Sequence, residues 1–383
     1  MKKGNQRLIR EHNAKLVLNL LREEGSLSRA QLSRRSGLAP SALTRQVRHL
    51  LDREIVVETG KQSSQGGRRG VLLSLNSEHA FAVGVKVERT RLLTALVNLE
   101  GKILNSQELD LDGDVSPEPL VRAIGRSVAT VCKGELLGVG VAVSGFVDPF
   151  SGHDYYSPIL GWHDVPFQAM LQSALDCPIW IENDVNALAL AESWFGAGRG
   201  ANDFVCVTVG EGVGAGLVLN NSLYRGTHGG AGELGHTCVQ PEGLPCRCGQ
   251  RGCLETLASD SFLKAAADRL AISGIAELAS LARAGSKEAI APFQIMGRSL
   301  GAGVVTLVNL LNPERIVLGG ERMDVFDLFF EPFREFVESR TFPHEAADLE
   351  ILPWELDAAG FVIGAATLPI ASFFQLPTGG RNP

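Results

Sequence analysis

The chain has 383 residues, 45% hydrophobic and 21% charged, which is typical of a globular protein that is too long for one compact core. No apolar run reaches the roughly 20 residues that a membrane span needs, and the basic N-terminus lacks the apolar segment of a signal peptide. We therefore expect two or three domains, a cytoplasmic location with free thiols, and no membrane partner.

The net charge of −7 is unevenly distributed. Residues 1–72 contain 15 basic and 6 acidic residues, a net charge of +9, whereas the remainder contains 21 basic and 37 acidic residues, a net charge of −16. A basic segment beside an acidic body indicates a polyanionic partner such as nucleic acid. A solvated basic face would have the same composition.

The first 54 residues predict three helices. Apolar residues recur at helical spacing over 7–24, Ser28 can cap a second helix over 29–37 with Ala30 and Leu32 facing inward, and Ser41 begins a third helix. Two helices joined by a short turn that contains Gly are typical of a helix-turn-helix. The third helix would then enter the major groove, with four early residues contacting bases and phosphates: Ser41, Thr44, Arg45 and Arg48.

A β-hairpin follows the three helices. Runs at 55–59 and 71–76 are rich in β-branched and aliphatic residues, and the segment between them is rich in Gly, Ser and basic residues. Arg68 and Arg69 at this tip could enter a narrow minor groove. The pattern predicts a winged helix-turn-helix DNA-binding domain over residues 1–75. The alternative is a small helical interaction module.

From about Glu78, strands alternate with helices, and Gly-rich turns separate them. Two α/β halves of this kind predict a two-lobed, actin-like (ribonuclease H-like) fold with a cleft between the lobes. The expected strands are at 81–88, 91–99, 101–109, 136–148 and 314–320, a strand-turn-helix unit is at 179–198, a hairpin is at 204–224, helices are at 119–132, 259–270, 275–284 and 287–311, and a strand with a closing helix is at 349–370.

The stretch 232–255 contains one His and four Cys, and its candidate metal ligands lie within 18 residues: His236, Cys246, Cys248 and Cys253. Thiolate and imidazole ligands at this spacing predict one structural Zn²⁺ per chain. A disulfide fits poorly because nothing in the chain indicates an oxidising compartment, and buried cysteines without a metal are the simplest alternative. Glu233 and Glu255 flank the cluster, where they could hold a small polyol.

Six segments carry a family resemblance: SGFVD, ENDVNALALAE, VTVGEGVGAGLVL, GGAGELGHTCV, CRCGQRGCLE and ERIVLGG. They resemble the ROK family (repressors, open reading frames and sugar kinases), almost end to end over the body. The N-terminal winged helix is similar to that of the NagC/XylR-like repressor branch. The resemblance implies a sugar in the interlobe cleft and a homodimer or homotetramer. It also implies a first lobe over 76–195, completed by a helix at about 358–383, and a second lobe over 196–357 that contains the zinc knuckle.

The resemblance implies site residues by motif. The metal ligands fall on His236 and the three cysteines, so that His236 would also orient the sugar. In kinase members the residue matching Asp184 is the general base on the sugar hydroxyl. Taken singly, Glu182 and Asp184 could only cap a helix, and Glu233 could be a surface turn residue. The sugar contacts fall on Gly145, Asn183, Asp184, Glu233, His236 and Glu255.

The ATP side of the cleft departs from the family pattern. The first phosphate loop, Asp-x-Gly-Gly-Thr in the family, reads Lys-Val-Glu-Arg-Thr at 86–90, and the second loop carries Glu211 between two glycines. Glu211 beside a phosphate would cost about 4 kcal/mol at 4 Å and an effective dielectric constant near 20. We therefore expect no enzyme activity and a sugar-responsive repressor of carbohydrate genes that binds double-stranded operator DNA.

Two other functions stay open. One is a bifunctional sugar kinase with a DNA-binding arm, and the other is regulation by a protein partner instead of a sugar. Trp162 and His163 could shape sugar choice, or they could be a packing aromatic and a surface His.

Overall fold

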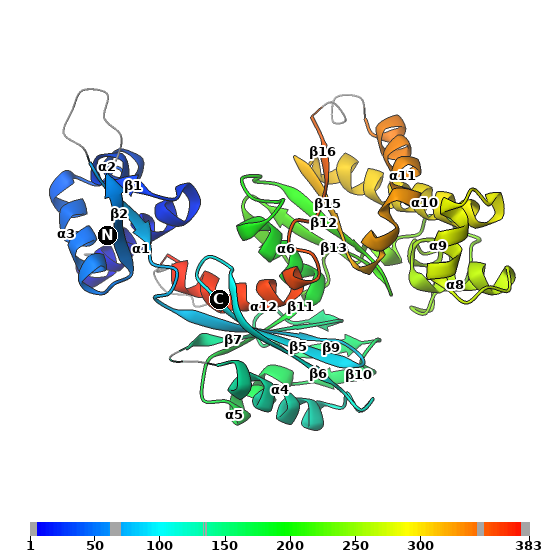
Figure 1. Cartoon of the computed structure of the whole chain (residues 1–383), viewed down its shortest axis with the longest axis horizontal. Coiled ribbons are helices and arrows are strands. Elements are labelled where there is room, and N and C mark those ends of the chain that lie inside the picture. The colour runs from blue at the N-terminus through cyan, green and yellow to red at the C-terminus, as the bar shows by residue number, and fades with distance from the viewer. Residues whose placement is uncertain (1–5, 62–69, 133, 135, 343–347, 377–383) are drawn as a thin grey trace.

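The computed structural model describes residues 6–61, 70–132, 134, 136–342 and 348–376. Figure 1 shows a small N-terminal domain (blue) beside a body of two α/β lobes, with the C-terminal helix (red) between them.

The N-terminal domain is a winged helix-turn-helix, as predicted. Ser28 caps the second helix through a capping box with Gln31. The prediction that Ala30 faces inward is wrong: Ala30 is exposed and Leu32 is fully buried, because residues two apart on a helix point to opposite sides. The elements are α1 (Gln6–Glu24), β1 (Leu27–Ser28), α2 (Arg29–Ser36), α3 (Pro40–Asp52), β2 (Val56–Lys61) and β3 (Val71–Leu75), with strand order β1-β3-β2.

The two lobes contain five-stranded sheets of identical topology, which confirms the two-lobed actin-like class. In each sheet the first three strands pair antiparallel, and the fourth and fifth strands add parallel to the first. The lobe 1 order is β11 (Ile179–Asn183), β7 (Leu136–Val143), β4 (Phe81–Val87), β5 (Arg91–Asn98), β6 (Ile103–Asp110). The lobe 2 order is β14 (Ser222–Tyr224), β13 (Val213–Leu219), β12 (Phe204–Val209), β15 (Arg315–Gly319), β16 (Glu350–Pro353).

The helix that follows the last strand of each lobe packs on the sheet of the other lobe. Helix α6 (Asp184–Phe195) follows β11 of lobe 1 but packs on β13 of lobe 2, and α12 (Ala359–Phe374) follows β16 but packs on β4 and β7. The two helices also pack on each other between the lobes (Figure 1). A Cβ on Gly84, Gly140 or Gly364 would lie within 2 Å of a backbone oxygen of this packing. Only glycine fits there, so α12 has little freedom to slide.

Several short elements were not predicted, because two to four residues carry too little periodicity to identify a strand. The helix predicted at 259–270 is present as α8 (Asp260–Arg269), and a short helix that was not predicted precedes it. The long helix α11 was also missed. The elements that were not predicted are β8 (Phe146–Val147), β9 (Asp154–Ser157), β10 (Trp162–Val165), α5 (Phe167–Ala174), α7 (Glu255–Ala258) and α11 (Phe326–Arg340). The predicted helices α4 (Pro117–Val131), α9 (Ile275–Arg283) and α10 (Lys287–Leu311) are present.

Helix α10 is long and apolar enough, by length and composition alone, to cross a membrane, although Arg298 interrupts its apolar run. One face of the helix is fully buried in the lobe 2 core through Phe293, Met296, Leu300, Val304 and Val308. This packing is that of the core helix of a globular domain.

The N-terminal domain packs directly on the body. One continuous apolar core joins Val17 and Leu21 of α1 to Ile370 and Phe374 of α12. The Lys15 ammonium donates to the Phe373 carbonyl, and the Asn19 amide donates to the Phe374 carbonyl at 3.0 Å.

A buried guanidinium completes this interface. Arg22 of α1 lies 4.1 Å from the ring centroid of Trp194, near the end of α6, and 5.8 Å from that of Phe374. The winged helix is thus seated on the ends of the two exchanged helices.

Candidate functional site

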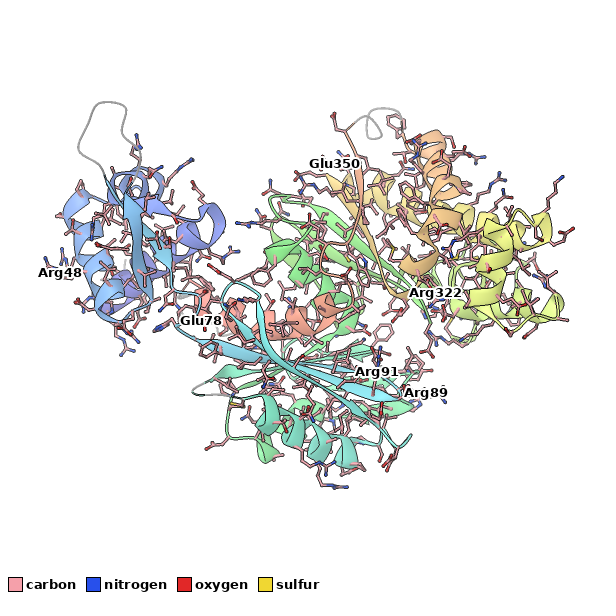
Figure 2. The ribbon with its side chains drawn as sticks, viewed as in Figure 1. Arg48, Glu78, Arg89, Arg91, Arg322 and Glu350 are labelled. Carbon is pink, nitrogen blue, oxygen red and sulfur yellow. The ribbon has the colours of Figure 1, made fainter. Side chains whose placement is uncertain are left out.

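A cleft of about 580 Å³ lies between the lobes. Its walls come from the β4–β5 loop, the start of α6, the β12–β13 turn and the cysteine-rich segment after β14. Figure 2 shows Arg89 and Arg91 at the end of the lobe 1 hairpin that is nearest to Arg322 of lobe 2. All six residues proposed as sugar contacts line this cleft: Gly145, Asn183, Asp184, Glu233, His236 and Glu255.

The start of α6 forms one wall. Asn183 is the N-cap: its side-chain oxygen accepts from the N–H groups of Val185 and Asn186, and its amide donates to the Gly145 carbonyl at 3.0 Å. This bond fixes the Gly145 turn against the helix start. Asp184 follows in the first turn, where the positive end of the helix dipole favours a carboxylate.

Lys86 is a cleft residue that the sequence analysis treated only as a departure from the phosphate loop. Its ammonium pairs with the Asp184 carboxylate and lies 4.7 Å from the Phe361 ring centroid. The Lys86 side chain is 8% exposed and the Asp184 side chain 16% exposed. The sequence did contain a signal for this residue: Lys86 is a single Lys inside the apolar strand 81–87. A charge buried in such a strand needs a partner of opposite charge.

Arg247, between two of the clustered cysteines, is a second residue that was missed. Its Nε lies 2.8 Å from Glu255 Oε1, and its Nη2 lies 3.1 Å from Glu255 Oε2. The ion pair links the cysteine-rich segment to the cleft wall.

Glu233 lines the same cleft. Burial raises the pKa of Glu233 to about 7, and the nearby carboxylates of Asp184 and Glu255 add to that rise.

The turn at 210–212, expected to correspond to the second phosphate loop, is in contact with other residues of the chain. The Gly210 N–H donates to the Gly212 carbonyl at 2.9 Å, and Asp260 N–H donates to the Gly210 carbonyl at 2.8 Å. A Cβ on Gly210 would lie 1.8 Å from the carboxylate of Glu321. Glu321 is exposed as a whole residue, but desolvation of its carboxyl group beside this turn raises the pKa of that group.

The predicted metal ligands converge. One ligand atom from each of His236, Cys246, Cys248 and Cys253 lies within 4.8 Å of the others. The Cys248 and Cys253 sulfurs are 3.6 Å apart, as are His236 Nδ1 and the Cys246 sulfur. Ligands of a tetrahedral Zn²⁺ with 2.3 Å bonds lie about 3.8 Å apart, and a disulfide needs about 2.05 Å. The cluster could therefore hold a metal ion.

The four α3 residues proposed for DNA contacts are all exposed: Ser41, Thr44, Arg45 and Arg48. Figure 2 shows Arg48 on the side of the domain that faces away from the body. The Thr44 hydroxyl donates to the Pro40 carbonyl at 2.8 Å. Arg68 and Arg69 lie outside the described residues.

Trp162 belongs to the lobe 1 core. It is 3% exposed, packs against Phe167 with the two rings tilted by 58°, and donates its indole N–H to the Val115 carbonyl at 2.8 Å. His163 is exposed and lies against the ring of Tyr156, which lines the cleft. Tyr156 is thus the aromatic residue of this segment that reaches the cleft.

Residues 82–371 match the ROK family, and residues 10–57 match a winged helix-turn-helix DNA-binding domain. The chain is 30% identical to the xylose repressor of Caldicellulosiruptor bescii, over 98% of this chain and 99% of that protein. A solved ROK family transcriptional regulator, a homologue of the E. coli MLC protein, has a TM-score of 0.81 and 26% identity, covering 96% of this chain and 97% of its own.

A solved ROK glucokinase from Streptomyces griseus, in complex with glucose and AMPPNP, has a TM-score of 0.67 and 29% identity. The match covers 76% of this chain and 99% of the glucokinase. The similarity to repressors therefore extends through the N-terminal domain, whereas the similarity to the kinase is limited to about the length of the body. On these matches and on its two duplicated lobes, the chain belongs to the ROK family, with a winged helix-turn-helix domain at its N-terminus.

Proposed function

We propose that this protein is a sugar-responsive, DNA-binding transcriptional repressor of carbohydrate genes, without kinase activity. One observation carries the proposal: a winged helix is seated on the same two helices whose first turns line a sugar-kinase-like cleft. Two relatives that match over nearly the whole chain are named as a xylose repressor and a ROK family transcriptional regulator, which supports the regulatory role. A bacterial cytoplasmic location follows from that role.

Operator DNA would meet the exposed face of α3. Arg45 and Arg48 would supply phosphate or base contacts, with Ser41 and Thr44 beside them, and the wing arginines Arg68 and Arg69 would reach the minor groove. The charge of +9 over residues 1–72 supports a polyanionic partner.

The sugar would bind among Gly145, Asn183, Asp184, Glu233, His236 and Glu255. Asp184 would accept a hydrogen bond from a hydroxyl rather than remove its proton, because Lys86 already neutralises its charge. Zn²⁺ would be held by His236 and the three clustered cysteines, and it would fix the segment that carries Arg247 and so orient Glu255. This role is structural, since four protein ligands leave no open position.

Sugar binding would act on DNA through α6 and α12. Asp184 is the first residue of α6, and Phe361, which lines the cleft, lies in the first turn of α12. The opposite ends of these helices hold Arg22 and Lys15 of the N-terminal domain. A lobe closure that moves either helix would shift the winged helices of a homodimer or homotetramer, and so change the spacing of the DNA half-sites that they fit.

The proposal also includes the division of the chain into residues 1–75, lobe 1 (76–195 with the C-terminal helix at about 358–383) and lobe 2 (196–357).

A bifunctional sugar kinase is the second candidate, because the body is 29% identical to a glucokinase. Lys86, Glu211 and Glu321 all oppose it. The carboxylates of Glu211 and Glu321 both line the cleft at the turn that would cradle phosphates. Detectable ATP-dependent phosphorylation of any hexose would favour the kinase.

The test of the proposal is fluorescence anisotropy of the protein on DNA from its own upstream region, at fixed salt, across a panel of sugars. We expect one sugar to change the DNA affinity severalfold and Asp184→Ala to abolish that change. If DNA binds but no sugar alters the affinity, the sugar assignment is wrong, and a protein partner becomes the next candidate.

A further inference from the structure

Lys86 is a buried basic residue in the wall of the cleft. Only 7% of the residue is exposed, at the end of β4, and its ammonium contacts Asp184 across 98 positions of sequence. Burying an ammonium group this deeply is costly without a partner of opposite charge, which Asp184 supplies. The pair nevertheless lines the cleft, so a ligand there can reach both groups.

The charges around the pair are mostly negative. Among the residues that the structure describes, six carboxylates line the cleft, against three side chains with ammonium or guanidinium groups: Lys86, Arg89 and Arg247. Two of these cations are engaged within the cleft, Lys86 with Asp184 and Arg247 with Glu255. Arg89 is exposed at the rim.

On the basis of the proposed function, we propose that Lys86 is a ligand-binding residue: with Asp184 it binds one hydroxyl of an uncharged sugar, so that the cleft selects neutral pyranoses over sugar phosphates. A hydroxyl both donates and accepts. It would donate to the Asp184 carboxylate and accept from the Lys86 ammonium, so each charge keeps a partner and no covalent bond changes.

A phosphorylated sugar fits this arrangement poorly. A phosphate ester brings about −1.5 to −2 charges at pH 7. To neutralise it, Lys86 would have to leave Asp184, whose carboxylate would then lie unpaired and largely buried beside Glu321 and Glu233. A neutral sugar imposes no such separation of charge.

Isothermal titration calorimetry on the full chain tests the inference. The probes are glucose, xylose and N-acetylglucosamine, the 6-phosphates of the two hexoses, and the monodeoxy analogues of whichever neutral sugar binds. The variants are Lys86→Met, the double variant Lys86→Met with Asp184→Asn, and the control Lys102→Met, which changes an exposed lysine of the same lobe. The double variant avoids a buried unpaired carboxylate, and its thermal unfolding checks that the protein folds.

We expect the wild type to bind one neutral sugar at least tenfold more tightly than any phosphate in the panel. Lys86→Met and the double variant should each weaken that binding by about 10- to 100-fold, the range of one hydrogen bond to a charged group. Lys102→Met should have no effect. One monodeoxy analogue should bind weakly to the wild type and lose little more in Lys86→Met, which identifies the hydroxyl that the pair binds.

Three results would count against the inference. Tighter binding of a sugar phosphate that depends on Lys86 would make Lys86 a phosphate ligand. Unchanged affinity in Lys86→Met, or wild-type affinity in the folded double variant, would make the pair structural only. If no sugar binds the wild type at all, the sugar part of the proposed function fails first.

Discussion

Arg22→Ala should uncouple the cleft from DNA while leaving both binding sites intact. The Arg22 side chain is 19% exposed and its guanidinium is stacked 4.1 Å from the ring centroid of Trp194. Burial lowers the pKa of Arg22, which nevertheless stays charged throughout the physiological range. Alanine removes the cation and its aromatic contacts but none of the residues of the cleft or of the α3 surface.

The size of the effect follows from these contacts. A cation–π contact contributes about 0.5 to 2 kcal/mol, more when desolvated. The contact with Phe374 is longer, at 5.8 Å, so the two together give about 1 to 3 kcal/mol of docking free energy. That corresponds to a roughly 5- to 150-fold fall in the ratio of docked to undocked N-terminal domains.

The assay compares DNA affinity by anisotropy with and without the active sugar, beside sugar affinity by calorimetry. In Arg22→Ala the sugar affinity should stay within about twofold of wild type, while the sugar-induced shift in DNA affinity falls towards zero. Small-angle X-ray scattering should show a larger radius of gyration. Arg22→Lys, which keeps the charge without the planar stacking, should lie between the two. Arg298→Ala, on the exposed side of α10, is the control.

The coupling through Arg22 would be refuted if Arg22→Ala kept the full sugar-induced shift in DNA affinity while scattering showed that the N-terminal domain had detached from the body. That result would mean that the signal reaches DNA by another path, such as the interface between copies.

Three further predictions concern the other sites. Cys248→Ser should lose zinc in elemental analysis, lower the melting temperature and blunt the sugar response, whereas Cys238→Ser, an exposed cysteine outside the cluster, should do none of these; a full response without metal would exclude zinc from the mechanism. Arg45→Ala should weaken DNA binding and reduce the slope of log K against log salt by about 1, and an unchanged slope would remove Arg45 from the DNA surface. Asp154 is fully buried, neither of its oxygens accepts a well-formed hydrogen bond from the described residues, and burial raises its pKa to about 7. A raised carboxyl pKa means that the folded state keeps its proton to a higher pH than the unfolded state, so stability falls as pH rises from about 4 to 7. Asp154→Asn should therefore raise the melting temperature most at pH 8, less at pH 5, and little below about pH 4. The same gain at both pH values, or an equal gain from Asp176→Asn at an exposed site, would contradict this assignment.

Local sequence patterns were sufficient to predict most helices and strands of this protein and its division into a winged helix and two lobes. Periodicity and the Ser28 cap identified the helices of the N-terminal domain, and alternating strands with Gly turns identified two α/β lobes. The metal cluster could be read because its ligands lie within 18 residues on one tight segment, so that their spacing already constrains their geometry. The same local patterns placed Ala30 on the wrong side of α2 and missed the short helix α7, since helix phase and very short elements depend on packing.

Contacts between distant segments were decided only by the tertiary structure. The exchange of α6 and α12 between the lobes depends on glycines in β4, β7 and α12 that admit backbone oxygens, and no local signal specifies which helix each glycine faces. Lys86 reaches Asp184 across 98 positions, and Arg22 reaches Trp194 from a different domain. A sequence pattern shows that a buried charge needs a partner, but only the folded chain chooses the partner, because that choice depends on which surfaces the whole core brings together.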